Sequence, residues 1–307
     1  MRDSANAGSR SKGTAGHQPN EAVAGSKPAG GLYLVATPIG NLDDITLRAL
    51  KVLKAADLIA CEDTRVTGKL LSLLGIGGAA LSPYHEHNAE RARPALVARL
   101  REGAVVALVS DAGTPLVSDP GYRLVRACLE EGLPVTSLPG PSAALTALQL
   151  SGLPCDRFLF AGFLPTKDGA RRQALAEVAA VPASLLFYES PRRLGDSLAA
   201  MAEVLGPRQA AVARELTKLY EEVRRGGLAE LAAHYAAEGP PKGEVVVVVG
   251  PPPAAAPTGE AELDAALVQA LAGASLRDAA AAVAAATGLP KRQVYARAVA
   301  LVGERGQ

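Results

Sequence analysis

Short apolar runs alternate with amphipathic segments through the first half of the chain. Four runs rich in Val, Leu, Ile and Ala are predicted to be buried strands, at residues 31–36, 57–61, 104–109 and 134–138. Between them, Leu47, Leu50 and Leu53 recur at helical spacing in a predicted helix over 46–55, and further helices are expected near Thr67, Tyr122 and Ala143. Strands that alternate with helices are typical of a mostly parallel sheet. We therefore predict an N-terminal α/β domain over residues 31–150.

The second half repeats this alternation. Its predicted strands are residues 158–163, 184–188, 210–213 and 244–249, and its predicted helices are 167–180 and one from Arg193. The last strand is almost entirely valine, and an uninterrupted β-branched run predicts a strand buried at the centre of a sheet. These segments predict a second α/β domain over residues 151–250.

The two ends of the chain differ from these domains. Residues 1–30 consist mainly of Gly, Ser, Ala and Asn with scattered charge, which predicts a disordered extension. Residues 251–259 are a proline-rich linker, and residues 260–307 contain three short helical patterns, at 263–272, 276–286 and 291–302. A short turn between small helices indicates a helix-turn-helix-like module. The last helix carries Lys291, Arg292, Arg297 and Arg305, so contact with RNA and a role as a structural cap both remain open.

Composition limits the class of protein. A hydrophobic fraction of 49% over 307 residues can supply two cores, and a net charge of +1 excludes a strongly basic protein but not a local basic patch. Three widely spaced cysteines, with no C-x-x-C, indicate free thiols in a reducing compartment. No apolar run reaches the length of a membrane span, and the N-terminus lacks a secretory signal. We expect a soluble cytoplasmic protein.

The loop Ser110–Gly121 is the clearest candidate for chemistry. It follows the predicted strand 104–109 and precedes a helix, and open α/β sheets bind ligands at such loops. It matches neither G-x-x-x-x-G-K-[ST] nor G-x-G-x-x-G, and Asp111 and Asp119 disfavour a polyanion. These carboxylates suit a ligand with hydroxyls or positive charge. The alternative is an ordinary cluster of surface turns.

Other strand-end loops share this character. Residues 37–40, 62–65 and 139–142 also follow predicted strands, and the carboxyl ends of parallel strands meet at one sheet edge. In the second domain, residues 188–193 and 214–218 end strands too. The positive charges there and on the neighbouring helix suit a phosphate backbone, namely Arg171, Arg172, Arg192, Arg193, Arg214 and Lys218. His85-Glu86-His87 matches no metal motif, so no metal is expected.

Six of these stretches together resemble one known family. The chain from about Gly31 onward is similar to ribosomal RNA small subunit methyltransferase I, a branch of the tetrapyrrole (corrin/porphyrin) methylase superfamily. The matching stretches, in order, are residues 34–46, 61–65, 110–121, 138–143, 187–193 and 214–218. The extension before Gly31 lies outside the resemblance.

The resemblance implies a function and a set of binding residues. It implies two α/β domains with a cleft between them for S-adenosyl-L-methionine, a homodimer, and methylation of a cytidine ribose 2′-OH in 16S rRNA of the 30S subunit, near the decoding centre. The implied donor-binding residues are Pro38, Asp111, Ala112, Gly113, Thr114, Pro115, Ser142, Ala143, Tyr188, Leu216 and Glu244.

Catalytic and RNA-binding roles stay open among several residues. A 2′-OH is weakly acidic, so a base near it would help the transfer, and the candidates are Glu62, Asp63, Glu189 and Glu215. Arg214 is a further catalytic candidate. The candidates for contact with RNA are Arg65, Arg192, Arg193, Lys218, Lys291 and Arg292. Two alternatives remain, a methylase of a tetrapyrrole such as a precorrin and a non-catalytic helix-turn-helix binder of nucleic acid.

Overall fold

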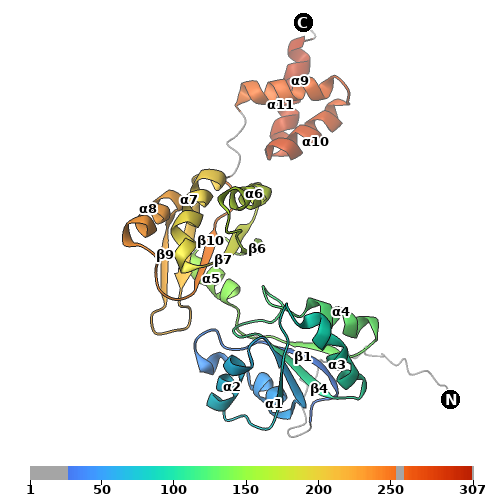
Figure 1. The fold of residues 1–307 in the computed structure, drawn as a ribbon. Helices are drawn as coiled ribbons and strands as arrows, with labels where there is room; N and C mark the ends of the chain where they lie inside the picture. The colour runs from blue at the N-terminus through green and yellow to red at the C-terminus, as the bar shows by residue number, and fades with distance from the viewer. Residues whose placement is uncertain (1–26, 254–258, 306–307) are drawn as a thin grey trace, which may run out of the picture. The chain divides into compact units, whose positions relative to one another are not determined.

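Strands and helices alternate along the chain in two units. The computed structural model describes residues 27–253 and 259–305 (Figure 1). The first unit ends at Gly140, and the short segment Ile39–Asn41 belongs with the second unit. The extension expected at residues 1–30 and the linker expected at 251–259 lie mostly outside the described residues.

The first unit is built on a wholly parallel sheet of five strands in the order β3-β2-β4-β1-β5. Its strands are β1 (Gly31–Val35), β2 (Leu58–Cys61), β3 (Ala80–Pro83), β4 (Val105–Val109) and β5 (Val135–Leu138). Its helices are η1 (Leu42–Asp44), α1 (Leu47–Ala55), α2 (Thr64–Leu73), α3 (Ala89–Arg101) and α4 (Tyr122–Glu130). β3 and α3 are elements that the sequence pattern did not predict.

Strand β4 explains how this sheet is covered on both faces. Val105, Ala107 and Val109 face a core completed by α1 and α2, whereas Val106 and Leu108 face a second core completed by α3 and α4. Every residue of β4 is buried, which is the environment that a continuous apolar run requires. The prediction of a parallel α/β domain is confirmed.

The second unit contains a mixed sheet of five strands in the order β6-β7-β10-β8-β9. Its strands are β6 (Phe158–Phe163), β7 (Ser184–Glu189), β8 (Gln209–Arg214), β9 (Glu222–Gly227) and β10 (Val245–Val249). Its helices are α5 (Ala143–Ser151), α6 (Asp168–Val178), η2 (Pro191–Arg193), α7 (Leu194–Leu205) and α8 (Leu228–Glu238). The valine strand β10 lies at the centre, as predicted, and runs antiparallel to both of its neighbours.

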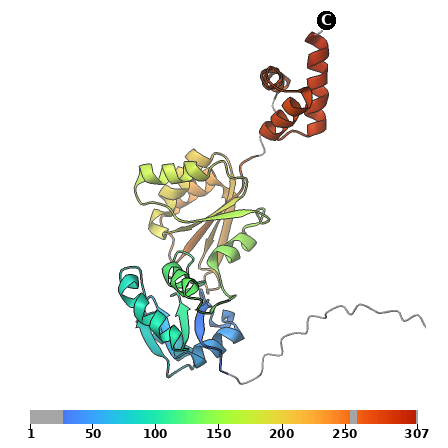
Figure 2. The same cartoon turned by 90° about the vertical axis from the view of Figure 1, so that its right-hand side faces the viewer.

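Helices cover both faces of this second sheet (Figure 2). α6, α7 and α8 pack on one face around Phe187, and α5 packs on the other face. The sequence placed the boundary between the domains near residues 151–156. In the structure α5 belongs to the second unit, because its buried residues pack against β7, β8 and β10 and against Ile39.

The C-terminal module consists of α9 (Glu260–Leu271), α10 (Leu276–Thr287) and α11 (Lys291–Arg305). Its own apolar core includes Leu267, Val283 and Val294. Ser275 caps α10, and the left-handed Gly288 ends it, so the expected helix-turn-helix-like arrangement is confirmed. In the described parts of the chain, no helix combines the length and apolar character needed to cross a bilayer.

Leu198 tests the packing of the second unit. Its side chain is fully buried in the core on the α6–α8 face. Leu198→Ala is expected to lower the free energy of unfolding by about 2–5 kcal/mol, because it removes buried methyl groups and leaves a cavity. Denaturant unfolding followed by circular dichroism measures this change. Leu219→Ala is the matched control: Leu219 is 87% exposed, so an equal loss of stability in both variants would contradict the packing described.

Candidate functional site

Strands β1 and β4 define the site of the first unit. The chain leaves the carboxyl end of β1 toward α1 on one face of the sheet, and leaves β4 toward α4 on the opposite face. Neighbouring strands whose connections diverge in this way form a topological switch point, where open α/β sheets place their ligands. The loop Ser110–Gly121 begins at this point, as the sequence indicated.

A backbone bridge fixes the start of this loop. Thr37 N donates to Gly113 O at 2.9 Å, and Gly113 N donates to Thr37 O at 3.0 Å. The Ser110 hydroxyl donates to Gly113 O at 2.9 Å, and the Thr37 hydroxyl donates to Ser110 O at 3.1 Å. Gly113 is buried and has φ 79°, a left-handed conformation that a side chain would strain. The loop is therefore tied to the end of β1.

Two further residues of the loop hold strained backbone. Leu116 has φ 72° and Ser118 has φ 62°, although neither is glycine. Left-handed residues with side chains are uncommon and persist where the surrounding structure fixes them, often at ligand sites. The backbone of the loop is therefore held in one conformation before any ligand binds.

Carboxylates crowd together at this edge. Asp119 lies in the field of Glu62 and Asp111 and shares a hydrogen bond with Glu62. Burial, followed by the charge of Glu62, raises the pKa of Asp119 to about 7. From sequence, Asp119 is assigned with Asp111 to a ligand that carries hydroxyls or positive charge, but it is not among the predicted donor-binding or catalytic residues. Its perturbed pKa now makes it a functional candidate.

Asp63 has a structural role instead. Its carboxylate caps α2 by accepting from Arg65 N at 2.8 Å, and it pairs with the Arg65 guanidinium at 2.6 Å. Hydrogen bonds from Arg65 lower the pKa of Asp63 to about 2, which makes it a weak base. Helix α2 consequently starts at Thr64, three residues before the predicted start at Thr67. These contacts argue against Asp63 as the base.

A shallow depression of about 470 Å³ lies beside these groups. Its walls include Glu62, Asp111, His85 and His87. The imidazole of His85 is half-buried, and its Nδ1 has no hydrogen-bond partner among the described residues. From sequence, these histidines match no metal motif, but the segment 84–88 could still face the cleft. The structure places His85 and His87 beside the strand-end residues Glu62 and Asp111.

In the second unit, Glu189 is enclosed at the end of β7. Its side chain is 0% exposed and accepts from Ser190 N and from the Ser197 hydroxyl, both at 2.6 Å. It also pairs with Arg193 at 2.6 Å. A carboxylate with each oxygen occupied and no exposure cannot receive a substrate proton. The structure argues against Glu189 as a base and indicates that it anchors the turn η2.

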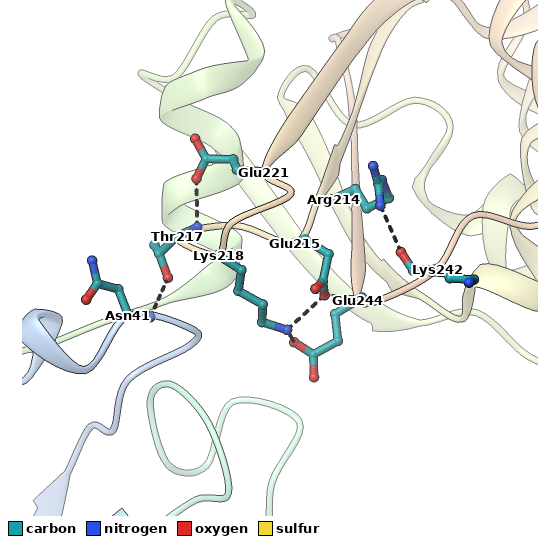
Figure 3. A network of polar contacts seen from close by, with 8 residues as sticks. All are labelled: Asn41, Arg214, Glu215, Thr217, Lys218, Glu221, Lys242 and Glu244. Carbon is teal, nitrogen blue, oxygen red and sulfur yellow. Dashed lines mark hydrogen bonds and ion pairs between the residues drawn. The ribbon is translucent and has the colours of Figure 1, made fainter. Parts of the chain in front are cut away.

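The loop between β8 and β9 is held by a network of polar contacts (Figure 3). Lys218 Nζ reaches Glu215 Oε1 at 2.8 Å and Glu244 Oε2 at 2.9 Å. Thr217 accepts from Asn41 N at 3.0 Å and donates from its own backbone N to Glu221 at 2.7 Å. A Cβ on Gly40 would lie 2.4 Å from Lys218 Cγ, so the segment Ile39–Asn41 fits here only with glycine.

Ion pairs neutralise the side chains of this loop that the sequence analysis proposed for catalysis or contact with RNA. The hydrogen bond from Lys218 lowers the pKa of Glu215, which lies in a left-handed conformation at φ 50°. Arg214 pairs with Glu222 at 2.9 Å and donates to Lys242 O at 3.2 Å (Figure 3 shows the contact with Lys242). Glu215, Arg214 and Lys218 are thus committed to one another and to their neighbours, which leaves them poorly suited to proton transfer.

The remaining predicted residues fall into buried and exposed groups. Ser142 caps α5 ahead of Ala143, and Leu216 is buried in the core under α5. Pro38, Thr114 and Tyr188 are half-buried, Pro115 is buried, and Ala112 and Glu244 are exposed. Among the RNA candidates, the exposed residues are Arg65, Arg192, Lys291 and Arg292. The expected basic face of α11 is smaller than predicted, because Arg297 pairs with Asp264 at 2.5 Å.

Comparison with known families identifies the scaffold. Residues 31–232 match the model of the Tetrapyrrole (Corrin/Porphyrin) Methylases, and residues 257–302 match the RsmI C-terminal HTH domain. The chain therefore belongs to the tetrapyrrole methylases, and within them to the methyltransferases named ribosomal RNA small subunit methyltransferase I.

Two relatives illustrate how far this similarity extends. The ribosomal RNA small subunit methyltransferase I of Mesorhizobium japonicum is 56% identical over 277 residues, covering 90% of this chain and 94% of the relative. The protein of the same name from Erythrobacter litoralis is 58% identical over 271 residues, covering 88% of this chain and 95% of the relative. The similarity thus includes both α/β domains and the helical module.

Solved structures share the fold at lower identity. Uroporphyrin-III-C-methyltransferase from Thermus thermophilus is 26% identical with a TM-score of 0.50, covering 72% of this chain and 94% of that one. A structure of uroporphyrin-III C-methyl transferase from Thermus thermophilus complexed with S-adenyl homocysteine is 21% identical with a TM-score of 0.50, covering 72% of this chain and 97% of that one. Methylases of this family take their methyl group from S-adenosylmethionine.

The loop Ser110–Gly121 fits such a donor. S-adenosylmethionine carries a positive sulfonium and an amino group, and Asp111 and Asp119 present negative charge to a ligand at this edge. Burial and the neighbouring charges of Glu62 and Asp111 both disfavour the ionised form of Asp119, and a cation beside these carboxylates would favour it. The buried Gly113 leaves backbone, rather than a side chain, at the start of the loop.

Asp119 makes the stability of the first unit depend on pH. The folded chain disfavours its ionised form, so the penalty is absent below the ordinary value of 3.8, grows as pH rises, and is complete above about 7. Asp119→Asn is expected to stabilise the protein by about 1–2 kcal/mol at pH 8 and to change little at pH 4, after allowance for solvent screening.

Denaturant unfolding at the two pH values measures this difference. Asp44→Asn, which replaces an exposed carboxyl of the same unit, is the matched control and should show no such dependence. An Asp119→Asn effect that is the same at both pH values would contradict the crowding described.

Proposed function

We propose that this protein transfers a methyl group from S-adenosylmethionine to the ribose 2′-OH of a cytidine in 16S rRNA, near the decoding centre. Support comes from its membership of a family whose members are named for the small-subunit rRNA, over nearly their whole length. The observation that carries the proposal is the preorganised acidic loop Ser110–Gly121 at the switch point of the parallel sheet. The proposal also includes a homodimer that acts in the cytoplasm.

The first unit is proposed to hold the donor. When bound, S-adenosylmethionine supplies an electrophilic methyl group on a sulfonium sulfur. Gly113 and its neighbours 112–115 would contact the donor through backbone, and Asp111 would face its positive charge. Alignment of donor and acceptor supplies most of the catalysis in a displacement of this kind.

Glu62 is the proposed base. Of the four carboxylates considered from sequence, Asp63, Glu189 and Glu215 are held by Arg65, Arg193 and Lys218. Glu62 is exposed, and no ion pair to it occurs within the described residues. Its hydrogen bond with Asp119 holds the Glu62 carboxylate beside the loop Ser110–Gly121.

The RNA is proposed to meet the exposed cations. Arg192, Lys291 and Arg292 lie on the surface and can each contact a phosphate. Arg65 is also exposed, although it pairs with Asp63. The module over α9–α11 matches a domain described as a helix-turn-helix, which favours RNA over a tetrapyrrole as the acceptor.

Gly113 provides the test of donor binding. Gly113→Ala is expected to weaken S-adenosylmethionine binding at least about tenfold, because a Cβ on a buried left-handed residue displaces the bridged backbone of the loop. Calorimetric titration measures the affinity. Gly132→Ala is the matched control: Gly132 has φ 67°, and its Cβ would meet nothing within 4 Å. Equal affinities for S-adenosylmethionine in the two variants would show that the donor does not bind at this loop.

Methyl transfer is tested with labelled donor and three acceptors offered separately: 30S subunits, free 16S rRNA and a precorrin. Label is expected in 16S rRNA and not in the precorrin. Alkaline hydrolysis then locates the label, because a 2′-O-methyl group protects the following phosphodiester and leaves an alkali-stable dinucleotide. Label released on a mononucleotide base would refute the ribose as acceptor. RNA binding without any transfer would favour the non-catalytic alternative.

A further inference from the structure

Strand β6 lies at one edge of the second sheet (Figure 1). It carries two of a group of three aromatic rings that contact one another. Phe160 and Phe163 contact Tyr188 of β7 edge to face, with ring centroids 4.8 Å and 5.5 Å apart. Phe163 is 57% exposed. We call Phe160, Phe163 and Tyr188 the β6 aromatic cluster.

Helix α5 leaves this cluster open. Phe160 and Tyr188 border the core that α5 covers, but α5 packs mainly over β8 and β10, toward the middle of the sheet. Phe163 lies outside that core and outside the core on the opposite face of the sheet. A large aromatic side chain exposed at the margin of a core costs solvation energy, and such exposure commonly marks a binding surface.

A bulge in β6 places Phe163 on this face. Phe160 pairs with Leu186, and Phe163 pairs with Tyr188, so β6 uses three residues where β7 uses two. Because side chains alternate along a strand, Phe163 would otherwise lie on the opposite face from Phe160. Gly162 at φ 67° supplies the left-handed residue that such a bulge needs. Bulges re-aim side chains and are frequent near functional sites.

Two cations follow the ends of β6 and β7 in the chain. Arg193 donates to Leu164 O at 3.0 Å and pairs with the buried Glu189, which ties the end of β6 to the turn η2. Its neighbour Arg192 is exposed and makes no ion pair or hydrogen bond with any described residue. Lys167, just beyond Leu164, is also exposed and unpaired within the described residues. The nearby Asp168 is already paired with Arg171 and Arg172.

We propose that Phe163, the exposed ring of the β6 aromatic cluster, stacks an unpaired nucleobase of the RNA substrate, with Arg192 and Lys167 available to neighbouring phosphates. This inference rests on the proposed RNA methyltransferase function. Exposed aromatic rings beside unpaired cations are how proteins hold single-stranded RNA, since every base offers a face for stacking and every linkage offers a charge. Access to a ribose hydroxyl within a structured RNA also requires the nucleotides around it to be unstacked. The cluster would hold one such base.

Three variants of the full-length protein test the role of Phe163 in catalysis. Phe163→Ala is expected to raise the KM for 30S subunits by about 5- to 100-fold, the usual effect of losing one stacked base, with donor affinity unchanged. Phe163→Tyr keeps the ring and should restore the wild-type KM, whereas Phe163→Leu keeps an apolar side chain and should not. Phe158→Ala is the matched control, because Phe158 is 46% exposed at the opposite end of the same strand.

A binding measurement separates this inference from the proposed reaction. A short single-stranded oligoribonucleotide containing 2-aminopurine loses fluorescence when its base stacks. Wild-type protein is expected to quench it, and Phe163→Ala is expected to quench it much less, whether or not methyl transfer occurs. Quenching without any methyl transfer would overturn the proposed function and retain the RNA-stacking cluster.

Three results would overturn the inference. The first is an unchanged KM for 30S subunits together with unchanged quenching in Phe163→Ala. The second is a loss of affinity for S-adenosylmethionine in that variant, which would assign the ring to the donor's adenine. The third is a loss of dimer mass by light scattering in Phe163→Ala, which would assign this sheet edge to contact between two copies of the chain.

Discussion

The pair of backbone hydrogen bonds between Thr37 and Gly113 is the constraint on which the first unit's site depends. At the carboxyl ends of a parallel sheet the strands stop pairing, and the loops that follow leave their peptide groups without partners. Here the loop after β4 pairs with the residue after β1, and Ser110 completes the junction. The loop must then return past Glu62 before α4 begins, which brings Asp111 and Asp119 toward that carboxylate. The crowding of charge follows from the path of the backbone.

In the second unit, by contrast, the carboxylates at the strand ends are paired with cations. Glu189 and Glu215 each have a cation within hydrogen-bonding distance, and Glu189 has a hydroxyl and a peptide N–H as well. A buried carboxylate is tolerated only when its charge and lone pairs are satisfied, so these residues stabilise loops rather than hold a spare proton site. Carboxylates that look equivalent in the sequence therefore differ in their surroundings. Glu62 and Asp119 lie together at the edge of the parallel sheet, whereas Glu189 and Glu215 at the edge of the mixed sheet are each paired with a cation.

The sequence predicted the buried parts of this fold better than its margins. Strands β4 and β10 were predictable because burial on both faces requires a continuous apolar run, and the grouping of loops at one edge followed from parallel strands. Strand β9 was missed because an edge strand that reads Glu-Val-Arg-Arg-Gly-Gly has no apolar alternation, and α3 was missed because Pro94 interrupts an arginine-rich pattern. The capping role of Asp63 had a local signal, an N-cap residue before a helix. The raised pKa of Asp119 had no local signal, since it depends on burial in the fold and then on Glu62 from another strand end.

Counting arginines in the sequence overstates the surface available to RNA. Arg193, Arg214, Lys218 and Arg297 are all neutralised by carboxylates of the same chain. The carboxylates around Asp119 suit a cationic donor but repel a phosphate backbone, so they offer no compensation. With a net charge of only +1, affinity for RNA must come from a few exposed cations. Stacking on aromatic rings does not depend on net charge. An exposed ring on β6 can therefore add affinity for RNA that the few exposed cations do not provide.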